Sequence, residues 1–149
     1  MEVVGMKLFT IGFTKKTAEQ FFSTLSSAKV KTLIDVRLNN VSQLAGFSKR
    51  KDLQYFLHVI CGVEYLHLPE LAPTPEILDE YRNRSHDWHD YEAQFLSLMR
   101  KRKVAQTLDR KVFDHACLLC SEDKPNQCHR RLVAEHLQKK WAGVEITHL

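Results

Sequence analysis

Three of the four cysteines in this chain of 149 residues fall within twelve positions, and they are the residues best suited to do chemistry. Cys117 and Cys120 belong to an apolar run that is typical of a buried strand, and Cys128 begins a helical pattern. A helix start lowers the pKa of a cysteine, because the helix dipole and nearby cations stabilise the thiolate. We therefore predict that Cys128 and Cys120 are catalytic, as a nucleophile or as a redox pair. The alternative is that both are small buried residues.

The residues after the last of these cysteines indicate an anion-binding site. His129, Arg130 and Arg131 are expected in the first turn of the helix, where cations oppose the helix dipole at a cost of roughly 0.3–1 kcal/mol each. A bound anion would reverse this cost, because the free N–H groups of a helix start bind anions. Nearby carboxylates of Glu122 and Asp35 would do the same. We assign the three cations to substrate binding and the two carboxylates to general acid or base catalysis.

A metal site on the same residues stays open as an alternative. It would need Cys120, Cys128, His129 and a distant ligand such as His67. If Cys117 lies on the strand, it cannot join such a site, because residues three apart on a strand point to opposite faces. We assign no metal ligand, and the cofactor is left unknown.

Several well-known catalytic loops do not fit the chain. A phosphatase loop needs an arginine six positions after its cysteine, but Asn126 and Ala134 hold those positions. Rhodanese-like enzymes share a Leu-Ile-Asp-Val-Arg strand like residues 33–37, but they carry a compact cysteine loop that the segment between Cys120 and Arg131 does not supply. No Walker loop, G-x-G-x-x-G fingerprint or G-x-S-x-G elbow occurs, which counts against nucleotide cofactors and serine hydrolysis.

A second polar group lies at the end of the strand predicted over residues 32–37. Asp35 and Arg37 are two positions apart on one strand face, and a guanidinium there suits phosphate or carboxylate. The alternative is a structural ion pair.

Two further segments complete the candidate site. Gly12 and Thr14 lie at the end of the first strand, and Asn39 opens an amide-rich loop over residues 38–48. The polar groups of that loop could contact a base or a sugar, or satisfy their own backbone. We assign Gly12, Thr14, Arg37 and Asn39 to substrate binding.

Short β-type runs alternate with helical patterns, which predicts β-α-β units and a parallel sheet. Strands are expected over residues 7–12, 32–37, 64–68, 115–120 and 144–148. The predicted helix starts are a capping box of Thr17 and Gln20, an N-cap at Thr74, an N-cap at Asp87, and a helix over about 127–141. Another helix carries Leu53, Phe56, Leu57 and Ile60 at helical spacing and ends near Gly62. With right-handed crossovers these elements predict an α/β fold, a single three-layer α/β/α domain over residues 1–149 with a mostly parallel sheet of about five strands. Ligands of such sheets bind beyond the carboxyl ends of the strands.

Charge and hydropathy narrow the class of protein. Lys and Arg number 22 against 18 Asp and Glu, which gives a net charge of +4 and a pI near 8.9. Nucleic acid remains a possible partner, but the basic residues come in short clusters that are typical of solvated helix ends. No apolar run approaches the roughly 20 residues that span a bilayer, and residues 1–7 lack the features of a secretory signal. We expect a cytoplasmic protein without a membrane contact and leave its oligomeric state open.

The motifs together resemble the uncharacterised "domain of unknown function" family numbered 488. The resemblance is carried by Thr10-Ile11-Gly12, Asp35-Val36-Arg37, Leu118-Leu119-Cys120-Ser121-Glu122 and Cys128-His129-Arg130. Residues 37–47 and 71–74 are similar to one subgroup, marked by Asn-Asn-Val-Ser-Gln-Leu-Ala-Gly-Phe. The family often has His-Ser after Ile-Gly, where this chain has Phe13-Thr14, and often a proline where it has Asn39. The resemblance implies an α/β fold and a shared polar site but no reaction.

The residues favour an enzyme, either a hydrolase or a group transferase, that acts on a phosphorylated or nucleotide-like substrate at the strand carboxyl ends. An anionic small molecule or nucleotide is the expected partner. The alternatives are a non-catalytic module that binds nucleic acid or a protein partner, and a cysteine-based metal or redox sensor.

Overall fold

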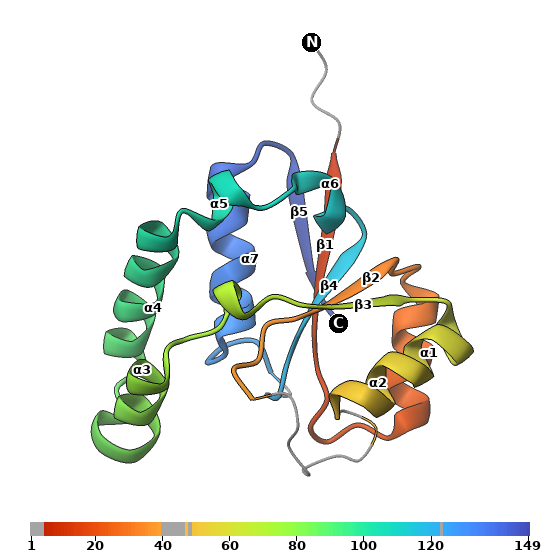
Figure 1. Cartoon of the computed structure of the whole chain (residues 1–149), viewed down its shortest axis with the longest axis horizontal. Coiled ribbons are helices and arrows are strands. Elements are labelled where there is room, and N and C mark those ends of the chain that lie inside the picture. The colour runs from red at the N-terminus through yellow and green to blue at the C-terminus, as the bar shows by residue number, and fades with distance from the viewer. Residues whose placement is uncertain (1–4, 40–46, 48, 123) are drawn as a thin grey trace.

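The computed structural model describes residues 5–39, 47, 49–122 and 124–149. Five strands form one all-parallel sheet in the order β3-β2-β4-β1-β5 (Figure 1). The strands are β1 (Met6–Gly12), β2 (Thr32–Asp35), β3 (Glu64–His67), β4 (Ala116–Cys120) and β5 (Val144–His148). The predicted α/β fold with five parallel strands is confirmed.

Helices cover both faces of the sheet and complete the three layers (Figure 1). One face carries α1 (Ala18–Ser27), α2 (Arg50–Phe56) and the π-helical turn η2 (Leu57–Cys61). The chain between β3 and β4 forms η3 (Pro69–Leu71), α3 (Pro75–Asp79), the π-helical turn η4 (Glu80–Ser85), α4 (Trp88–Arg102), α5 (Val104–Thr107) and α6 (Arg110–Phe113). This long connection and α7 (His129–Lys140) pack on the other face. Among the described residues, no helix combines the length and apolar character needed to cross a membrane.

The central strand β4 shows the alternation that separates the two hydrophobic cores. Cys117 and Leu119 pack with α1 and α2, whereas Leu118 and Cys120 pack with α4 and α7. All four side chains are buried, since β4 has neighbours on both edges and helices on both faces. The expectation that Cys117 and Cys120 point to opposite faces is confirmed.

The predicted helix starts form as expected. The Thr17 hydroxyl accepts from the Gln20 backbone N–H at 3.1 Å, and the Gln20 side chain accepts from the Thr17 N–H at 2.9 Å. Thr74 caps α3 through the Ile77 N–H, and Asp87 caps α4 through the Asp90 N–H. These caps fix where α3 and α4 leave the carboxyl edge of the sheet.

Several boundaries differ from the prediction by one or two residues, and three departures have local reasons. Strand β2 ends at Asp35 rather than at residue 37, because the Asp35 carboxylate accepts the Arg37 backbone N–H. The helix after residue 50 widens into the π-turn η2, which shifts its phase and leaves Ile60 56% exposed. Helix α7 begins at His129, so that Cys128 is its N-cap residue.

Candidate functional site

The candidate site lies where the chain reverses its direction of travel across the sheet. From β2 the chain continues to β3 at one edge of the sheet, whereas from β4 it continues in the opposite direction, beyond β1, to β5 at the other edge. The connections that leave β2 and β4, which are neighbours, therefore run in opposite directions. This opens the crevice where parallel sheets bind ligands. A pocket of about 180 Å³ lies there, and the predicted site residues that line it are Arg37, Asn39, Cys120, Glu122, Cys128 and His129.

A thiol and an imidazole are paired at the wall of this pocket. The Nε2 atom of His129 lies 2.6 Å from the Val36 carbonyl oxygen, and a carbonyl only accepts, so Nε2 carries a proton and donates it. The other ring nitrogen, Nδ1, lies 3.5 Å from Sγ of Cys120. Phe95 packs against the ring at 5.4 Å between centroids. Val36 and Phe95 thus hold the imidazole with its second nitrogen turned to the thiol.

The pKa values of Cys120 and Cys128 are shifted in opposite directions. A hydrogen bond from the Cys128 thiol lowers the pKa of Cys120, against the opposing effect of burial. Burial raises the pKa of Cys128 well above its usual value, and the neighbouring Cys120 raises it further. The prediction of a lowered pKa at Cys128 is therefore wrong, because Cys128 is only 3% exposed and lies beside the Cys120 thiol. Cys120 is therefore the more acidic thiol of the pair.

The same cluster has the donor set of a metal site. The ligand atoms of Cys120, Cys128 and His129 all lie within 4.8 Å of one another. His67, the distant ligand considered from the sequence, instead places its Nε2 3.0 Å from the Arg37 carbonyl oxygen. Among the described residues the group contains three donors, which suits a site with one open position better than a closed four-ligand site.

The two arginines in the first turn of α7 have partners within the protein. Arg130 is fully buried, with Nε 3.3 Å from the Thr10 hydroxyl and NH1 donating to the Glu122 carbonyl oxygen. Its charge also lowers the pKa of Cys120. Arg131 forms an ion pair with Glu135 at 3.0 Å, one helical turn further on. Arg130 thus holds the loop after Cys120 through the Glu122 carbonyl. Neither Arg130 nor Arg131 lines the pocket.

Gly12 and Thr14 hold the same loop from the β1 side. A Cβ atom at Gly12 would lie 1.6 Å from the Glu122 carbonyl oxygen, so a residue without a side chain is required there. The Thr14 hydroxyl donates to the Ser121 carbonyl at 2.8 Å. Both residues lie outside the pocket wall and contact the segment that carries Cys120 and Glu122.

Asp35 and Arg37 form a buried ion pair. The Arg37 Nε and NH2 atoms donate to the two carboxylate oxygens at 2.9 and 2.8 Å, and the Tyr65 hydroxyl donates to the second oxygen at 2.6 Å. The Arg37 guanidinium also lies over the Phe13 ring. Asp35 is fully buried behind Arg37, and Arg37 reaches the pocket with its charge already matched.

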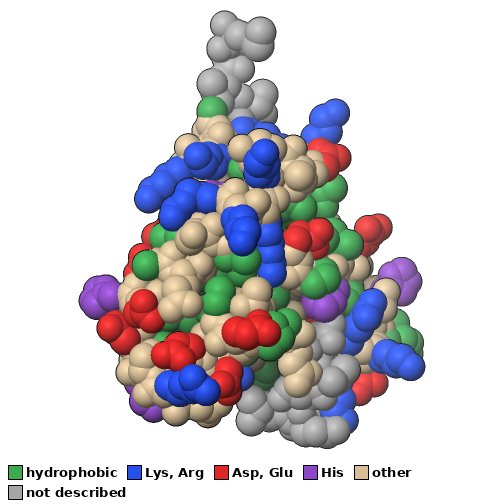
Figure 2. Space-filling model, turned by 60° about the vertical axis from the view of Figure 1, so that its left-hand side comes forward, with side chains coloured by type: hydrophobic (Ala, Val, Ile, Leu, Met, Phe, Trp, Pro, Cys, Tyr) green, Lys and Arg blue, Asp and Glu red, His purple; other side chains and the backbone are tan. Residues whose placement is uncertain are grey.

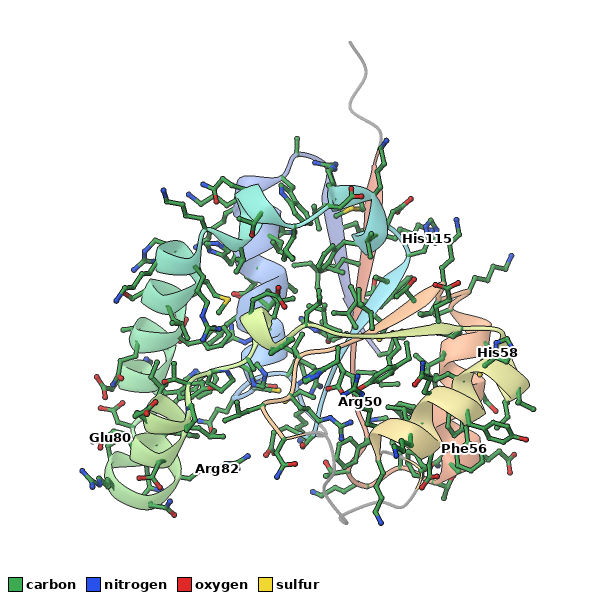
Figure 3. All side chains as sticks on the ribbon, viewed as in Figure 1. Arg50, Phe56, His58, Glu80, Arg82 and His115 are labelled. Carbon is green, nitrogen blue, oxygen red and sulfur yellow. The ribbon has the colours of Figure 1, made fainter. Side chains whose placement is uncertain are left out.

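The opposite wall comes from residues that the sequence analysis did not select. Pro73, Leu78, Tyr81, Arg82, Trp88 and Tyr91 line it, from the segment that runs from η3 through η4 into α4. Tyr91 packs on Trp88 and Tyr81. Arg82 projects from η4 toward the centre of the molecule, whereas Glu80 points away from it (Figure 3). The only sequence signal was the cluster of aromatic residues, which is equally typical of a helix core.

Two of the short basic clusters lie in the last turns of helices. Arg100, Lys101 and Arg102 occupy the last turn of α4, and Lys139 and Lys140 that of α7. Helix α7 has 12 residues and is therefore about 18 Å long, with its start at the pocket. Lys and Arg side chains gather toward the upper end of the face shown in Figure 2. As predicted, these clusters lie at helix ends.

The amide-rich loop lies largely outside the described residues, as do most of residues 37–47 used for the subgroup resemblance. Among the described residues of that loop, Leu38 and Asn39 line the pocket.

Comparison with known proteins agrees with the sequence motifs. The model of the family described as "Domain of unknown function DUF488" matches residues 17–137. Searches of curated proteins and of solved structures returned no match. The matched range covers more than half of the chain and includes Arg37, Cys120, Cys128 and His129. The chain belongs to the domain of unknown function family DUF488.

Proposed function

We propose that the protein is an enzyme, a hydrolase or group transferase, with Cys120 as its nucleophile. The observation that carries this proposal is the 3.5 Å contact between Cys120 Sγ and His129 Nδ1 at the pocket wall. A nucleophile beside a base that a third group orients is the arrangement of covalent catalysis, and here the third group is the Val36 carbonyl.

Each partner of Cys120 has a separate role in this mechanism. His129 accepts the thiol proton on Nδ1 and later returns it to a leaving group, while Nε2–H stays bound to Val36. The hydrogen bond from Cys128 lowers the pKa of Cys120, which increases the thiolate fraction near neutral pH. Glu122 is exposed at the pocket and is the acid or base for an incoming water or acceptor hydroxyl.

The pocket favours a phosphorylated or nucleotide-like substrate. Arg82 supplies a positive charge on the wall opposite Cys120, and Arg37 supplies a second guanidinium whose charge Asp35 matches. Trp88 and Tyr91 supply flat apolar surface beside Arg82. An anionic group next to a planar ring complements this combination. A free thiolate of this kind also supports the expected cytoplasmic location, since thiols remain reduced there.

Turnover by cysteine variants tests the proposal. Reduced, metal-free protein is incubated with a panel of nucleotides and sugar phosphates, and products and protein adducts are followed by mass spectrometry. We expect turnover by the wild type and by Cys117→Ala, none by Cys120→Ser, and a loss of about 10²–10⁴-fold in His129→Ala. Turnover that survives Cys120→Ser would overturn the proposed nucleophile. Binding without turnover would instead favour the non-catalytic binding module.

A metal-bound form of the same cluster is the second candidate. The three donors within 4.8 Å favour it, as does the Val36 carbonyl, since a ligating histidine usually donates its other N–H to such an acceptor. Elemental analysis of protein purified without chelator separates the two candidates. About one metal ion per chain that Cys128→Ser loses and Cys117→Ala keeps would favour the metal sensor, and metal-free active protein would favour the thiol enzyme.

A further inference from the structure

We propose that Cys120 and Cys128 are an oxidation site, at which a hydroperoxide converts the two thiols into an intramolecular disulfide. The Sγ atoms of Cys120 and Cys128 lie within 4.8 Å of each other, and both side chains line the pocket. A small peroxide can therefore reach the sulfur of Cys120 while the second thiol lies close beside it. Inactivation by this bond rests on the proposed function, whereas its formation does not.

The chemistry needs one equivalent of peroxide and no other reactant. The Cys120 thiolate attacks one peroxide oxygen, the O–O bond breaks, and the released hydroxide takes up a proton to leave as water. Cys120 is then a sulfenic acid, oxidised by two electrons. The Cys128 sulfur attacks the Cys120 sulfur, the S–O bond breaks, and a second water leaves with the Cys128 proton. His129 Nδ1, 3.5 Å from Cys120 Sγ, lies where that proton has to pass.

Local structure leaves Cys128 able to turn toward Cys120. Cys128 is the N-cap residue of α7 with extended backbone angles, and its side chain makes no capping hydrogen bond with the described first turn. Formation of the disulfide therefore breaks no capping hydrogen bond of α7. Cys120 ends β4, and the segment between the two cysteines already returns beside the strand, held by Arg130 and Thr14.

The other two cysteines have no part in this pair. Cys117 points into the opposite core, where burial raises its pKa. Cys61 lies on η2 and donates to the Phe22 carbonyl at 3.5 Å. All four cysteines are free thiols in the structure. The choice of Cys120 and Cys128 as the pair that is oxidised therefore rests on their positions.

Peptide mapping after mild oxidation tests the proposal. Metal-free reduced protein receives one equivalent of hydrogen peroxide and is then unfolded in guanidinium, and the free thiols of the unfolded chain are blocked with N-ethylmaleimide. We expect a peptide pair joined through Cys120 and Cys128, lighter by two hydrogens than the reduced form and restored by dithiothreitol. In Cys128→Ser, dimedone should label Cys120, because the sulfenic acid has no partner thiol. In Cys120→Ser, Cys128 should stay alkylatable, and Cys117→Ala and Cys61→Ser should behave like the wild type.

Two results would overturn the oxidation site: both thiols remaining alkylatable after peroxide, or oxidation that goes to Cys61 or to bonds between chains. The proposed function is measured separately, by turnover of the reduced protein. A disulfide that forms in a protein without turnover would support the oxidation site and contradict the proposed enzyme. Turnover in a protein that forms no disulfide after peroxide would support the enzyme and contradict the oxidation site.

Discussion

The α-carbon of Gly12, at the end of β1, lies so close to the Glu122 carbonyl that an added Cβ would approach the oxygen to 1.6 Å. The same oxygen accepts from Arg130, which is buried below it. The loop that carries Cys120 and Glu122 is therefore seated on β1 and on α7 at once. Its position depends on a glycine 108 positions earlier in the chain than Cys120.

Substitution of this glycine should displace the loop. Because the obstacle is backbone, we expect Gly12→Ala to lower the free energy of unfolding by roughly 1–3 kcal/mol and to slow alkylation of Cys120. Gly5→Ala is the matched control, since nothing lies within 4 Å of a Cβ there. Urea unfolding and iodoacetamide rates measure both effects. Equal stability of the two variants would show that the loop is not seated as described.

The ion pair of Asp35 and Arg37 should be structural. Asp35→Ala removes the carboxylate that matches the charge of buried Arg37, which should cost about 3–5 kcal/mol of unfolding free energy. Glu80→Ala breaks the exposed pair with Arg84 and should change stability by less than about 1 kcal/mol. Chemical denaturation compares the two. A stable Asp35→Ala protein that has lost turnover would instead give Asp35 the catalytic role predicted from the sequence.

Two arginines of η4 allow the effect of a charge in the pocket to be compared with the effect of a charge on the surface. Arg82 lines the pocket, whereas Arg84 is 73% exposed and pairs with Glu80. We expect Arg82→Ala to weaken the binding of adenosine monophosphate about tenfold, or roughly 1.4 kcal/mol, and Arg84→Ala to leave it unchanged. Titration calorimetry at constant salt gives both constants. Equal losses in the two variants would indicate a diffuse charge effect and no specific anion contact.

Removal of the Cys128 thiol should make Cys120 a weaker acid. Its hydrogen bond is the largest cause of the lowered pKa of Cys120, so Cys128→Ala should raise that pKa. The thiolate fraction of Cys120 near pH 7 then falls, and alkylation should slow by about tenfold or more. Cys61→Ser, on η2, is the control and should leave the rate unchanged. A faster reaction in Cys128→Ala would mean that access to Cys120, and not its ionisation, limits the rate.

The sequence predicted the frame of the site better than its walls. The five strands, the helix caps and the opposite faces of Cys117 and Cys120 follow from local periodicity and side-chain hydrogen bonds, which the chain encodes over a few residues. The order of the strands in the sheet was not predicted. The sequence left open whether Cys120, Cys128 and His129 meet, although a short loop between a strand end and the next helix start allows it.

Burial and partnering across the sheet were beyond local reasoning. The acidity of Cys128 was predicted in the wrong direction, since the helix dipole was visible in the sequence but the buried contact with Cys120 was not. Arg130 was assigned to substrate, yet it is buried and bonded to Thr10, 120 positions away. Arg82 and Trp88 reach the pocket only because the connection between β3 and β4 folds back over the carboxyl edge of the sheet.

The most direct test of the account is the pH dependence of Cys120 alkylation in reduced, metal-free wild-type protein, followed by peptide mass spectrometry. A lowered pKa means that the thiolate persists to lower pH, so Cys120 should react with a midpoint clearly below the ordinary thiol value of about 8.5, while Cys128 stays unreactive over the same range. A midpoint at or above that value, or a reactive Cys128 beside an inert Cys120, would contradict the assignment of Cys120 as the thiolate of the site.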